Sequence, residues 1–432
     1  MSTARYPQLG RYATIRRLTD WWDSPRSASW RGKPGLITTY VLSRIFLVLV
    51  PLGFFPYSGG KLMANDVVLY NSWAQVIMSG HYPVNDPMWQ YPPLAGFVFA
   101  IGSAITSHPT AGFIILALLA DLLIFVTLLR RGLAVGRLAG AWTYTIAGLV
   151  IGPVMLSRFD IFPTVLAVFA LLMLAKPVRS GILLGFGTLL KVWPAFLIVA
   201  HPRRALPKVA AAMIATVVAG MSLLSLWGPG FLTFLKEQGD RGLQIESVGG
   251  VVYVIGQYLG LDVETVFRYG SMEINATGAG FIASFVTIAG FVTLGAIAYA
   301  RLRGRLEHVA GPDVALAVIL VSIASSRVFS PQYMVWVAGI AGVCMLSSHT
   351  RMKPIIWLLM LVALFGQLVY PFTYGNMMTG GWYGVLFQAL RIGLLMVATA
   401  WAVVRVMRPV RAAESGASDD HVAAQRRESD FA

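Results

Sequence analysis

Long apolar stretches separated by short polar ones dominate the pattern of this chain. A helix needs roughly 17 to 25 consecutive apolar residues to cross a bilayer, and about ten runs of this kind occur. The pattern therefore predicts a membrane protein that crosses the bilayer many times. The predicted spans lie near residues 36–55, 110–129, 138–155, 161–175, 208–228, 279–300, 312–328, 332–348, 354–371 and 382–404.

Two shorter apolar runs do not fit a simple alternation of crossings. The run 180–200 has a basic segment on each side, KPVR before it and HPRR after it, and a single crossing would put these segments on opposite faces. We therefore expect a broken, re-entrant hairpin with its tip at LLKVWP, because Pro194 removes a backbone donor and irregular backbone is tolerated beside a wet cavity. The run 94–106 poses the same problem and is predicted to be half-membrane or interfacial. The fold class predicted is all-α and polytopic, with about 10–13 transmembrane helices including broken ones.

Composition and charge agree with this fold class. The 432 residues are 57% hydrophobic and 12% charged, and the mean hydropathy is +0.69. A net charge of +15 would suggest nucleic acid in a soluble protein, but here we attribute it to topology and expect no nucleic-acid partner. Most of the 34 Lys and Arg residues fall in segments that can share one face, which predicts cytoplasmic N- and C-termini.

This topology divides the chain into three parts. Residues 1–35 form a basic cytoplasmic segment, residues 36–408 form the transmembrane domain, and residues 409–432 form a polar, disordered cytoplasmic tail. The outer face receives the loops 56–93, 156–160, 229–278, 327–331 and 371–381. We expect the active site to be formed by these outer loops, above all by 56–93 and 229–278.

The first outer segment carries a carboxylate at the membrane edge, within DVVLYNSWAQVIMSGHYPVNDPMWQYPPLA. Asp66 could be a general base that removes a proton from an acceptor hydroxyl. Alternatively, Asn65 or Asp66 could cap a helix over VVLYNSWAQVIMSG that closes at Gly80. The two interpretations are compatible, and the residues alone leave both open.

Aromatic residues follow Asp66 at irregular intervals. Their rings could be apolar platforms for sugars, or they could belong to the belt of aromatic side chains at a membrane interface, which the spacing alone favours. The residues concerned are Tyr70, Trp73, Tyr82, Trp89 and Tyr91.

Charged residues at the outer ends of spans mark substrate pathways. Arg158 and Asp160 lie in one outer turn, and Lys191 lies at the tip of the expected hairpin, where it could hold a lipid phosphate as a point charge. The alternative is a structural pair between Arg158 and Asp160, with the Lys191 side chain extending to the interface.

Two further outer segments hold candidate substrate-binding residues. SSRVFSPQYMVWV brings Arg327, Gln332 and Tyr333 to the end of a span, although ordinary turn chemistry would look the same. GDRGLQIESVGG brings Arg241, Gln244 and Glu246 between glycines, as a mobile loop covering a substrate would. An ordinary solvated connection is the alternative there. The stretch 251–268 that follows is expected to be a helix along the interface.

Inside the spans, Arg44 and Asp121 are expected at similar depth, and a buried pair would spare each the cost of isolation. The single cysteine, Cys344, excludes a disulfide framework. No spacing of a protein metal site and no glycine-rich nucleotide loop occurs in the sequence. We therefore expect no cofactor.

Taken together, these segments resemble the GT-C superfamily of polytopic glycosyltransferases and, within it, glycosyltransferase family 87. The matching pieces are Asp66 with LYNSWAQVIMSGHYP, then WQYPPLA, SRFDIFPT, GFGTLLKVWP, DRGLQIES and RVFSPQYMVW. They occur in family-like order over about residues 36–340. The family includes actinobacterial mannosyltransferases that use polyprenyl-phosphate mannose to build phosphatidylinositol mannosides and lipoglycans.

The resemblance implies that Asp66 is the catalytic base and that the donor is a sugar, most simply mannose, on a polyprenyl monophosphate. Transfer would invert the anomeric carbon at the outer face of the plasma membrane, and a glycolipid or lipoglycan would be the acceptor. Lys191, Arg158 and Arg327 would neutralise the donor phosphate, and Trp193 of GFGTLLKVWP would join the substrate-binding residues. Many GT-C enzymes have paired acids at the first-loop site and bind a divalent cation, whereas Asn65 precedes Asp66 here, so metal dependence stays open.

Three alternatives remain at this stage. A transporter or lipid flippase would also show broken helices and charged span ends, but it would often carry an internal repeat and a site near the midplane. An arabinofuranosyltransferase could use the same scaffold. An O-antigen ligase or polymerase would use a diphosphate-linked donor.

Overall fold

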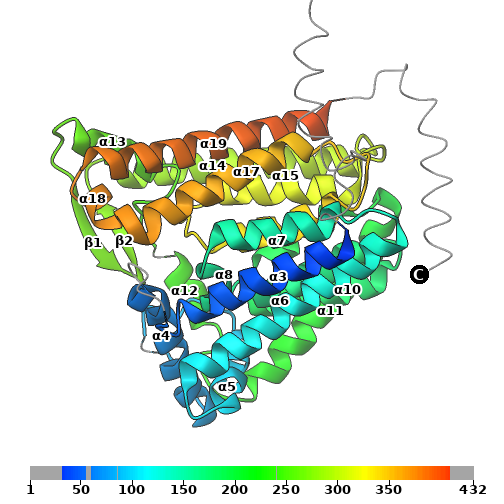
Figure 1. Cartoon of the computed structure of the whole chain (residues 1–432), viewed down its shortest axis with the longest axis horizontal. Coiled ribbons are helices and arrows are strands. Elements are labelled where there is room, and N and C mark those ends of the chain that lie inside the picture. Colours follow the sequence, from blue (N-terminus) through cyan, green and yellow to red (C-terminus); the bar gives the residue numbers. More distant parts are fainter. Residues whose placement is uncertain (1–31, 55–59, 85, 240, 409–432) are drawn as a thin grey trace, which may run out of the picture.

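The protein is a bundle of helices that run mostly along one direction (Figure 1). A computed structural model describes residues 32–54, 60–84, 86–239 and 241–408. The expected basic segment 1–35 lies almost entirely, and the expected tail 409–432 entirely, outside the described residues. Two groups of helices diverge from the end where α3 begins, one with α14, α15, α17 and α19 and the other with α3, α6, α10 and α11 (Figure 1).

The elements follow one another in this order: α3 (Lys33–Leu49), α4 (Gly60–Met78), α5 (Leu94–Ile105), α6 (Pro109–Ala134), α7 (Ala139–Ile151), α8 (Val154–Ser157), α9 (Ile161–Leu172), α10 (Pro177–Leu190), η3 (Trp193–Ala200), η4 (Arg203–Ala205), α11 (Leu206–Ser225), α12 (Thr233–Gly239), α13 (Gly250–Tyr258), β1 (Glu264–Arg268), β2 (Ser271–Asn275), α14 (Ala279–Leu302), α15 (Gly311–Ala324), α16 (Tyr333–Cys344), α17 (Lys353–Gln367), η5 (Leu368–Thr373), α18 (Tyr374–Met378) and α19 (Trp382–Met407).

The expected all-α polytopic architecture is confirmed. Among the described residues, five helices are long and apolar enough to cross a membrane: Thr110–Ala134, Arg203–Ser225, Ala279–Leu302, Lys353–Met378 and Trp382–Met407. Six shorter apolar helices accompany them. Each apolar run predicted as a span corresponds to a helix or to a pair of consecutive helices. The run 94–106 is the short helix α5.

The segment 180–200 folds back on itself as expected. Helix α10 ends at Leu190, Lys191 has extended backbone, and the 3₁₀ helix η3 begins at Trp193 with Pro194 in its first turn. His201, after η3, lies with its Nε2 atom 2.8 Å from the Ser180 hydroxyl in the first turn of α10. The two ends of the segment therefore meet, and Lys191 is at the tip between them.

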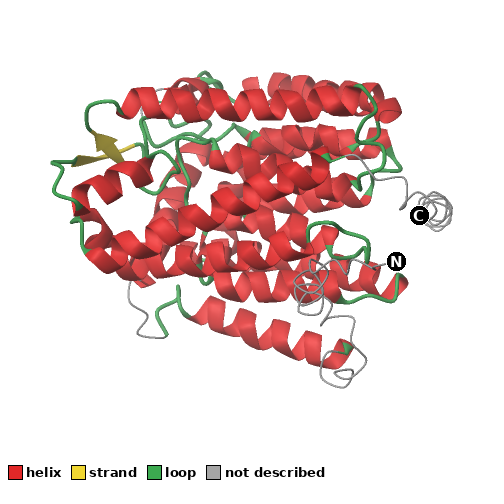
Figure 2. Ribbon diagram, turned by 90° about the horizontal axis from the view of Figure 1, so that it is seen from above, coloured by secondary structure: helices red, strands yellow, loops and turns green. Residues whose placement is uncertain are grey.

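Both ends of the described chain lie at the same end of the bundle. The start of α3 and the end of α19 are close to this end in Figure 1. The strands β1 and β2 lie at the opposite end in Figure 1 and in Figure 2. Which end faces the cytoplasm stays a prediction from the basic residues.

The interfacial helix expected over 251–268 is only partly formed. Helix α13 ends at Tyr258, and β1 then pairs antiparallel with β2 in a two-stranded sheet. Between the strands, Tyr269 and Gly270 have φ values of 50° and 74°, as a type I′ hairpin turn requires. The turn geometry therefore overrode the helical pattern over residues 264–268.

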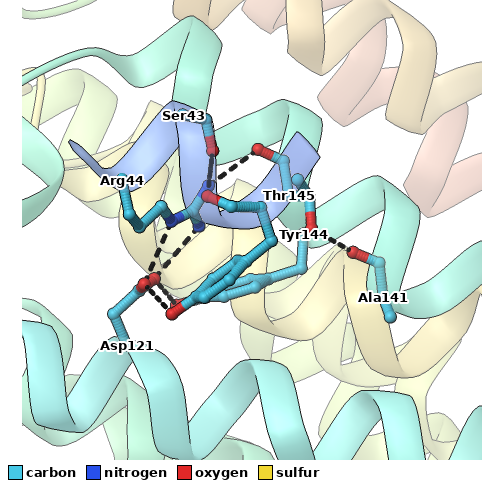
Figure 3. A network of polar contacts seen from close by, with 7 residues as sticks. Ser43, Arg44, Asp121, Ala141, Tyr144 and Thr145 are labelled. Atoms are coloured by element: carbon cyan, nitrogen blue, oxygen red, sulfur yellow. Dashed lines mark hydrogen bonds and ion pairs between the residues drawn. The ribbon is translucent and has the colours of Figure 1, made fainter. Parts of the chain in front are cut away.

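The buried pair expected inside the spans is confirmed and joins three helices. Arg44 of α3 donates from Nε and Nη2 to the two Asp121 oxygens of α6, at 3.0 Å each. The Tyr40 and Tyr144 hydroxyls also donate to this carboxylate, at 2.6 and 2.7 Å. Arg44 donates further to the carbonyl of Thr145 in α7 (Figure 3). Arg44 and Asp121 are both buried, and each neutralises the charge of the other.

Candidate functional site

Asp66 lies inside α4, which begins at Gly60. The interpretation of Asn65 or Asp66 as a helix cap is therefore wrong, because both residues are beyond the first turn. Of the expected loop 56–93, residues 60–78 form α4 and the described residues after Met78 form a loop, whereas residues 56–59 lie outside the described residues. The Asp66 side chain is 38% exposed, and its Oδ2 atom lies 2.9 Å from Nε of Arg158.

Arg158 lies between α8 and α9 and is almost fully buried. Besides Asp66, it reaches the Tyr370 hydroxyl with Nη2 at 3.3 Å and the Ser157 carbonyl with Nη1 at 3.1 Å. Tyr370 comes from the irregular segment η5, where Pro371 interrupts the helix. The cation thus holds together α4, the 152–160 turn and η5, and it pairs with the Asp66 carboxylate.

The structural pair considered between Arg158 and Asp160 is not formed. Asp160 is fully buried at the start of α9 and pairs with Lys191 instead, with Oδ1 2.7 Å from Nζ. The same oxygen accepts a hydrogen bond of 2.6 Å from the indole Nε1 of Trp336. The extended backbone at the hairpin tip is what directs Lys191 toward this carboxylate rather than along a helix face.

Aromatic rings surround Lys191. Its Nζ atom lies 5.6, 5.4 and 5.2 Å from the ring centres of Tyr91, Tyr333 and Trp336, within the range of cation–π attraction. Tyr333 stacks on Trp336 at 4.1 Å, and Trp336 stacks on Trp193 at 4.9 Å. The side chain of Lys191 is only 19% exposed. The Asp160 carboxylate and the three aromatic rings therefore hold its ammonium group in place.

Two tyrosines connect the ion pairs. The Tyr91 ring lies beside Lys191, and its hydroxyl is 3.2 Å from the hydroxyl of Tyr70. Tyr70 is on α4, one turn after Asp66. The pairs Asp66–Arg158 and Asp160–Lys191 therefore belong to one site at the end of the bundle that holds α4.

The remaining aromatic candidates of the segment 66–91 are buried. Trp73 donates from Nε1 to Asp86 at 2.7 Å and packs edge-on against Trp89 at 5.2 Å. Tyr82 donates to the carbonyl of Leu224 at 2.9 Å. These three side chains lie in the hydrophobic core, so neither an exposed sugar platform nor an interfacial belt describes their position.

A cavity of about 240 Å³ opens beside Tyr333. The polar residues of its lining include Arg241, Arg327, Ser322 and Ser325, and the apolar ones include Phe291 of α14. Two arginines in a partly apolar hollow suit an anionic headgroup joined to an apolar chain. The other candidate of this turn, Gln332, precedes α16 and is half-buried.

The expected substrate-covering loop is instead fixed by buried hydrogen bonds. Gln244 and Glu246 are buried, and Glu246 Oε1 lies 2.8 Å from Nη1 of Arg391 in α19. Burial raises the pKa of Glu246, and Arg391 opposes this shift. Burial also raises the pKa of Glu273, while the backbone N–H of Gly242 lowers it by donating to Oε1 at 3.1 Å.

Sequence reasoning missed Arg391, Tyr370 and Trp336. Arg391 had a usable signal, because an arginine within the apolar run WYGVLFQALRIGLLMV has to face the bundle interior and find a partner. Tyr370 and Trp336 had no such signal in the sequence, since aromatic residues are common in membrane helices. Within the described ranges, no group of three or more His, Cys, Asp or Glu side chains could hold a metal ion.

Comparison with known proteins identifies one sequence family that matches the chain. The sequence model of glycosyltransferase family 87 matches residues 89–331. No curated protein matches the chain, and no solved structure matches it.

Proposed function

Since this chain belongs to glycosyltransferase family 87, it is a membrane glycosyltransferase, and we propose that it transfers mannose from a polyprenyl-phosphate donor. The acceptor is a glycolipid or lipoglycan at the outer face of an actinobacterial plasma membrane. Family membership disfavours the transporter alternative. An arabinofuranosyltransferase on the same scaffold differs only in the sugar.

The observation that carries the proposal is the partly exposed carboxylate of Asp66 beside a buried arginine. An acceptor hydroxyl would give its proton to Asp66 while its oxygen bonds to the anomeric carbon. The bond from that carbon to the phosphate oxygen breaks, and polyprenyl phosphate leaves with the electron pair. Because attack and departure occur on opposite faces, the anomeric configuration inverts.

We assign the donor phosphate to the cavity that contains Arg241 and Arg327. Of the cations expected to bind it, Arg158 is engaged by Asp66 and Lys191 by Asp160, whereas Arg327 lines the open hollow. Preorganised cations stabilise the charge that develops on a leaving phosphate. Arg158 and Lys191 would then act indirectly. Arg158 would orient the carboxylate of Asp66, and Lys191 would orient that of Asp160.

The surroundings of the cavity suit the donor's apolar tail. Large side chains on the face of α14 are exposed one turn apart, at Phe281, Phe285, Ile288 and Phe291, and Phe291 also lines the cavity. A polyprenyl chain lying along this face would reach the two arginines with its phosphate. This arrangement favours a lipid-linked donor over a soluble nucleotide sugar.

The test compares wild type with Asp66→Asn at matched membrane levels, for transfer of labelled mannose from synthetic polyprenyl-phosphate mannose to extracted membrane glycolipids. Removing a general base should reduce transfer by about a hundredfold or more. Asp86→Asn is the matched control, because Asp86 follows the same helix but is engaged by Trp73 and the Met88 backbone. It should retain most of the activity.

Each departure from this result has a defined meaning. Equal transfer by wild type and Asp66→Asn would remove Asp66 as the base. Transfer of arabinose but not mannose by wild type would identify the alternative donor. Transfer of neither sugar would reject the proposed donor class.

A further inference from the structure

Arg391 is a fully buried cation that α19 places beneath the outer loops. Its Nη1 atom pairs with Glu246 at 2.8 Å, and its Nη2 atom donates to the carbonyl of Phe329 at 3.1 Å. The guanidinium also lies 4.1 Å from the Phe329 ring centre. One side chain therefore holds both the loop that contains Glu246 and the turn that contains Phe329.

Gln244 completes the connection between this loop and this turn. Its Oε1 atom accepts from the backbone N–H of Phe329 at 2.7 Å, and its Nε2 atom donates to Glu246 Oε2 at 3.1 Å. Its own backbone N–H donates to the carbonyl of Arg327 at 2.9 Å. The backbone on both sides of residue 328 is thus fixed by groups that Arg391 and Glu246 hold.

The contacts continue to the second cavity arginine. Arg327 donates from Nη1 to the carbonyl of Arg241 at 2.9 Å. Arg241 donates from Nη2 to the Tyr269 carbonyl and the Ser271 hydroxyl, at 3.2 Å each. A continuous series of hydrogen bonds therefore leads from the membrane helix α19 to both cations of the cavity.

We infer that Arg391 is a positioning residue that sets the places of Arg327 and Arg241, and thereby the affinity for the donor phosphate. This inference rests on the proposed function. An arginine suits this place, because its two Nη atoms are fixed in one plane and reach Glu246 and Phe329 at once, whereas a lysine is shorter and has a single nitrogen. The packing leaves room for it: a Cβ atom on Gly366 of α17 would lie 3.3 Å from Arg391 Nε.

The test is the kinetics of Arg391→Lys in the full-length, purified protein, with Arg44→Lys as the matched control. Both substitutions shorten a buried arginine that binds a carboxylate and a backbone carbonyl, but Arg44 lies in the separate network of α3, α6 and α7. We expect Arg391→Lys to raise the KM for polyprenyl-phosphate mannose about tenfold, since small misplacements of binding groups are costly. Its kcat should change by less than about threefold.

Direct binding separates positioning from folding. Polyprenyl phosphate without a sugar is the probe, and its Kd should rise in parallel for Arg391→Lys and stay unchanged for Arg44→Lys. If Arg391→Lys does not fold, Glu246→Gln provides the same test, because it keeps the shape of the side chain and removes one acceptor of the series. Its effect should be smaller and in the same direction.

The possible failures are distinguishable. If wild type neither binds polyprenyl phosphate nor uses the mannosyl donor, the proposed function fails. If wild type binds it and both variants at this site retain its Kd and KM, only the inference about Arg391 is overturned. An equal rise of Kd in Arg44→Lys would also overturn it, because the effect would then be a general loss of packing.

Discussion

Replacing Asp121 tests the buried network that joins α3, α6 and α7 (Figure 3). In Asp121→Ala, Arg44 loses both Nε and Nη2 contacts, and the hydroxyls of Tyr40 and Tyr144 lose their acceptor. All four side chains are buried, so the change leaves a charge and two polar groups without compensation.

The expected cost is large. Removing one partner of a buried ion pair costs about 3–5 kcal/mol, and each unsatisfied hydroxyl costs about 1–3 kcal/mol. These terms share one network and do not add fully. Their combination is nevertheless a large part of the roughly 5–15 kcal/mol that stabilises an ordinary folded protein.

The assay is thermal unfolding of the detergent-solubilised full-length protein, followed by tryptophan fluorescence and size-exclusion chromatography. Asp121→Ala should lower the unfolding midpoint most, and Asp121→Asn should lower it less because one acceptor oxygen remains. The double variant Arg44→Met, Asp121→Leu should recover part of the loss, since it removes both charges together. Asp262→Ala, at an exposed carboxylate, is the control.

The reasoning would be refuted by an Asp121→Ala midpoint equal to that of Asp262→Ala. It would also be refuted by a double variant less stable than Asp121→Ala alone, because the penalty would then not arise from the isolated charge of Arg44.

Two further substitutions address the cavity and the turn before α8. Arg327→Ala should raise the donor KM about tenfold or more, since a hydrogen bond to a charged group contributes about 1.5–3 kcal/mol. An unchanged KM in a donor titration would show that the donor phosphate does not bind at Arg327. Gly152→Ala should lower the unfolding midpoint more than Gly53→Ala. Both glycines have positive φ, but only a Cβ atom at position 152 would meet a neighbour, because it would lie 2.3 Å from Nε2 of Gln367. Equal midpoints would show that the close contact relaxes without cost.

The sequence was sufficient for the features that depend on hydrophobicity and on local backbone chemistry. Apolar runs located the helices, since the bilayer imposes both length and composition. Pro194 and the basic segments around 180–200 located the break at Lys191. The pairing of Arg44 with Asp121 could be predicted because a charged side chain deep inside a span has few other groups of opposite charge within reach.

The charge pairings at the end of the bundle that holds α4 could not be derived in the same way. Arg158 has Asp160 two residues away and Asp66 far along the chain, and sequence separation favours the first. The fold selects the second, because Lys191 reaches Asp160 from the hairpin tip and leaves Arg158 directed toward α4. The choice depends on tertiary placement, which periodicity does not contain.

The β-hairpin after α13 was missed for a different reason. Its apolar residues fit an interfacial helix as well as a short strand, so hydrophobicity could not decide. The usable signal was Tyr269–Gly270, a pair that can provide the two positive φ angles of a tight turn. Turn chemistry was therefore more informative here than the pattern of the flanking residues.

The pairing of Glu246 with Arg391 has a consequence for how the enzyme is assembled. The two residues are 145 positions apart, and Arg391 belongs to the last described helix, beyond the region 89–331 that matches the family. During synthesis, the loop that contains Glu246 is complete long before α19 exists, and until α19 arrives Glu246 lacks its cation. Catalytic competence should therefore appear only when α19 has packed into the bundle and brought Arg391 to Glu246.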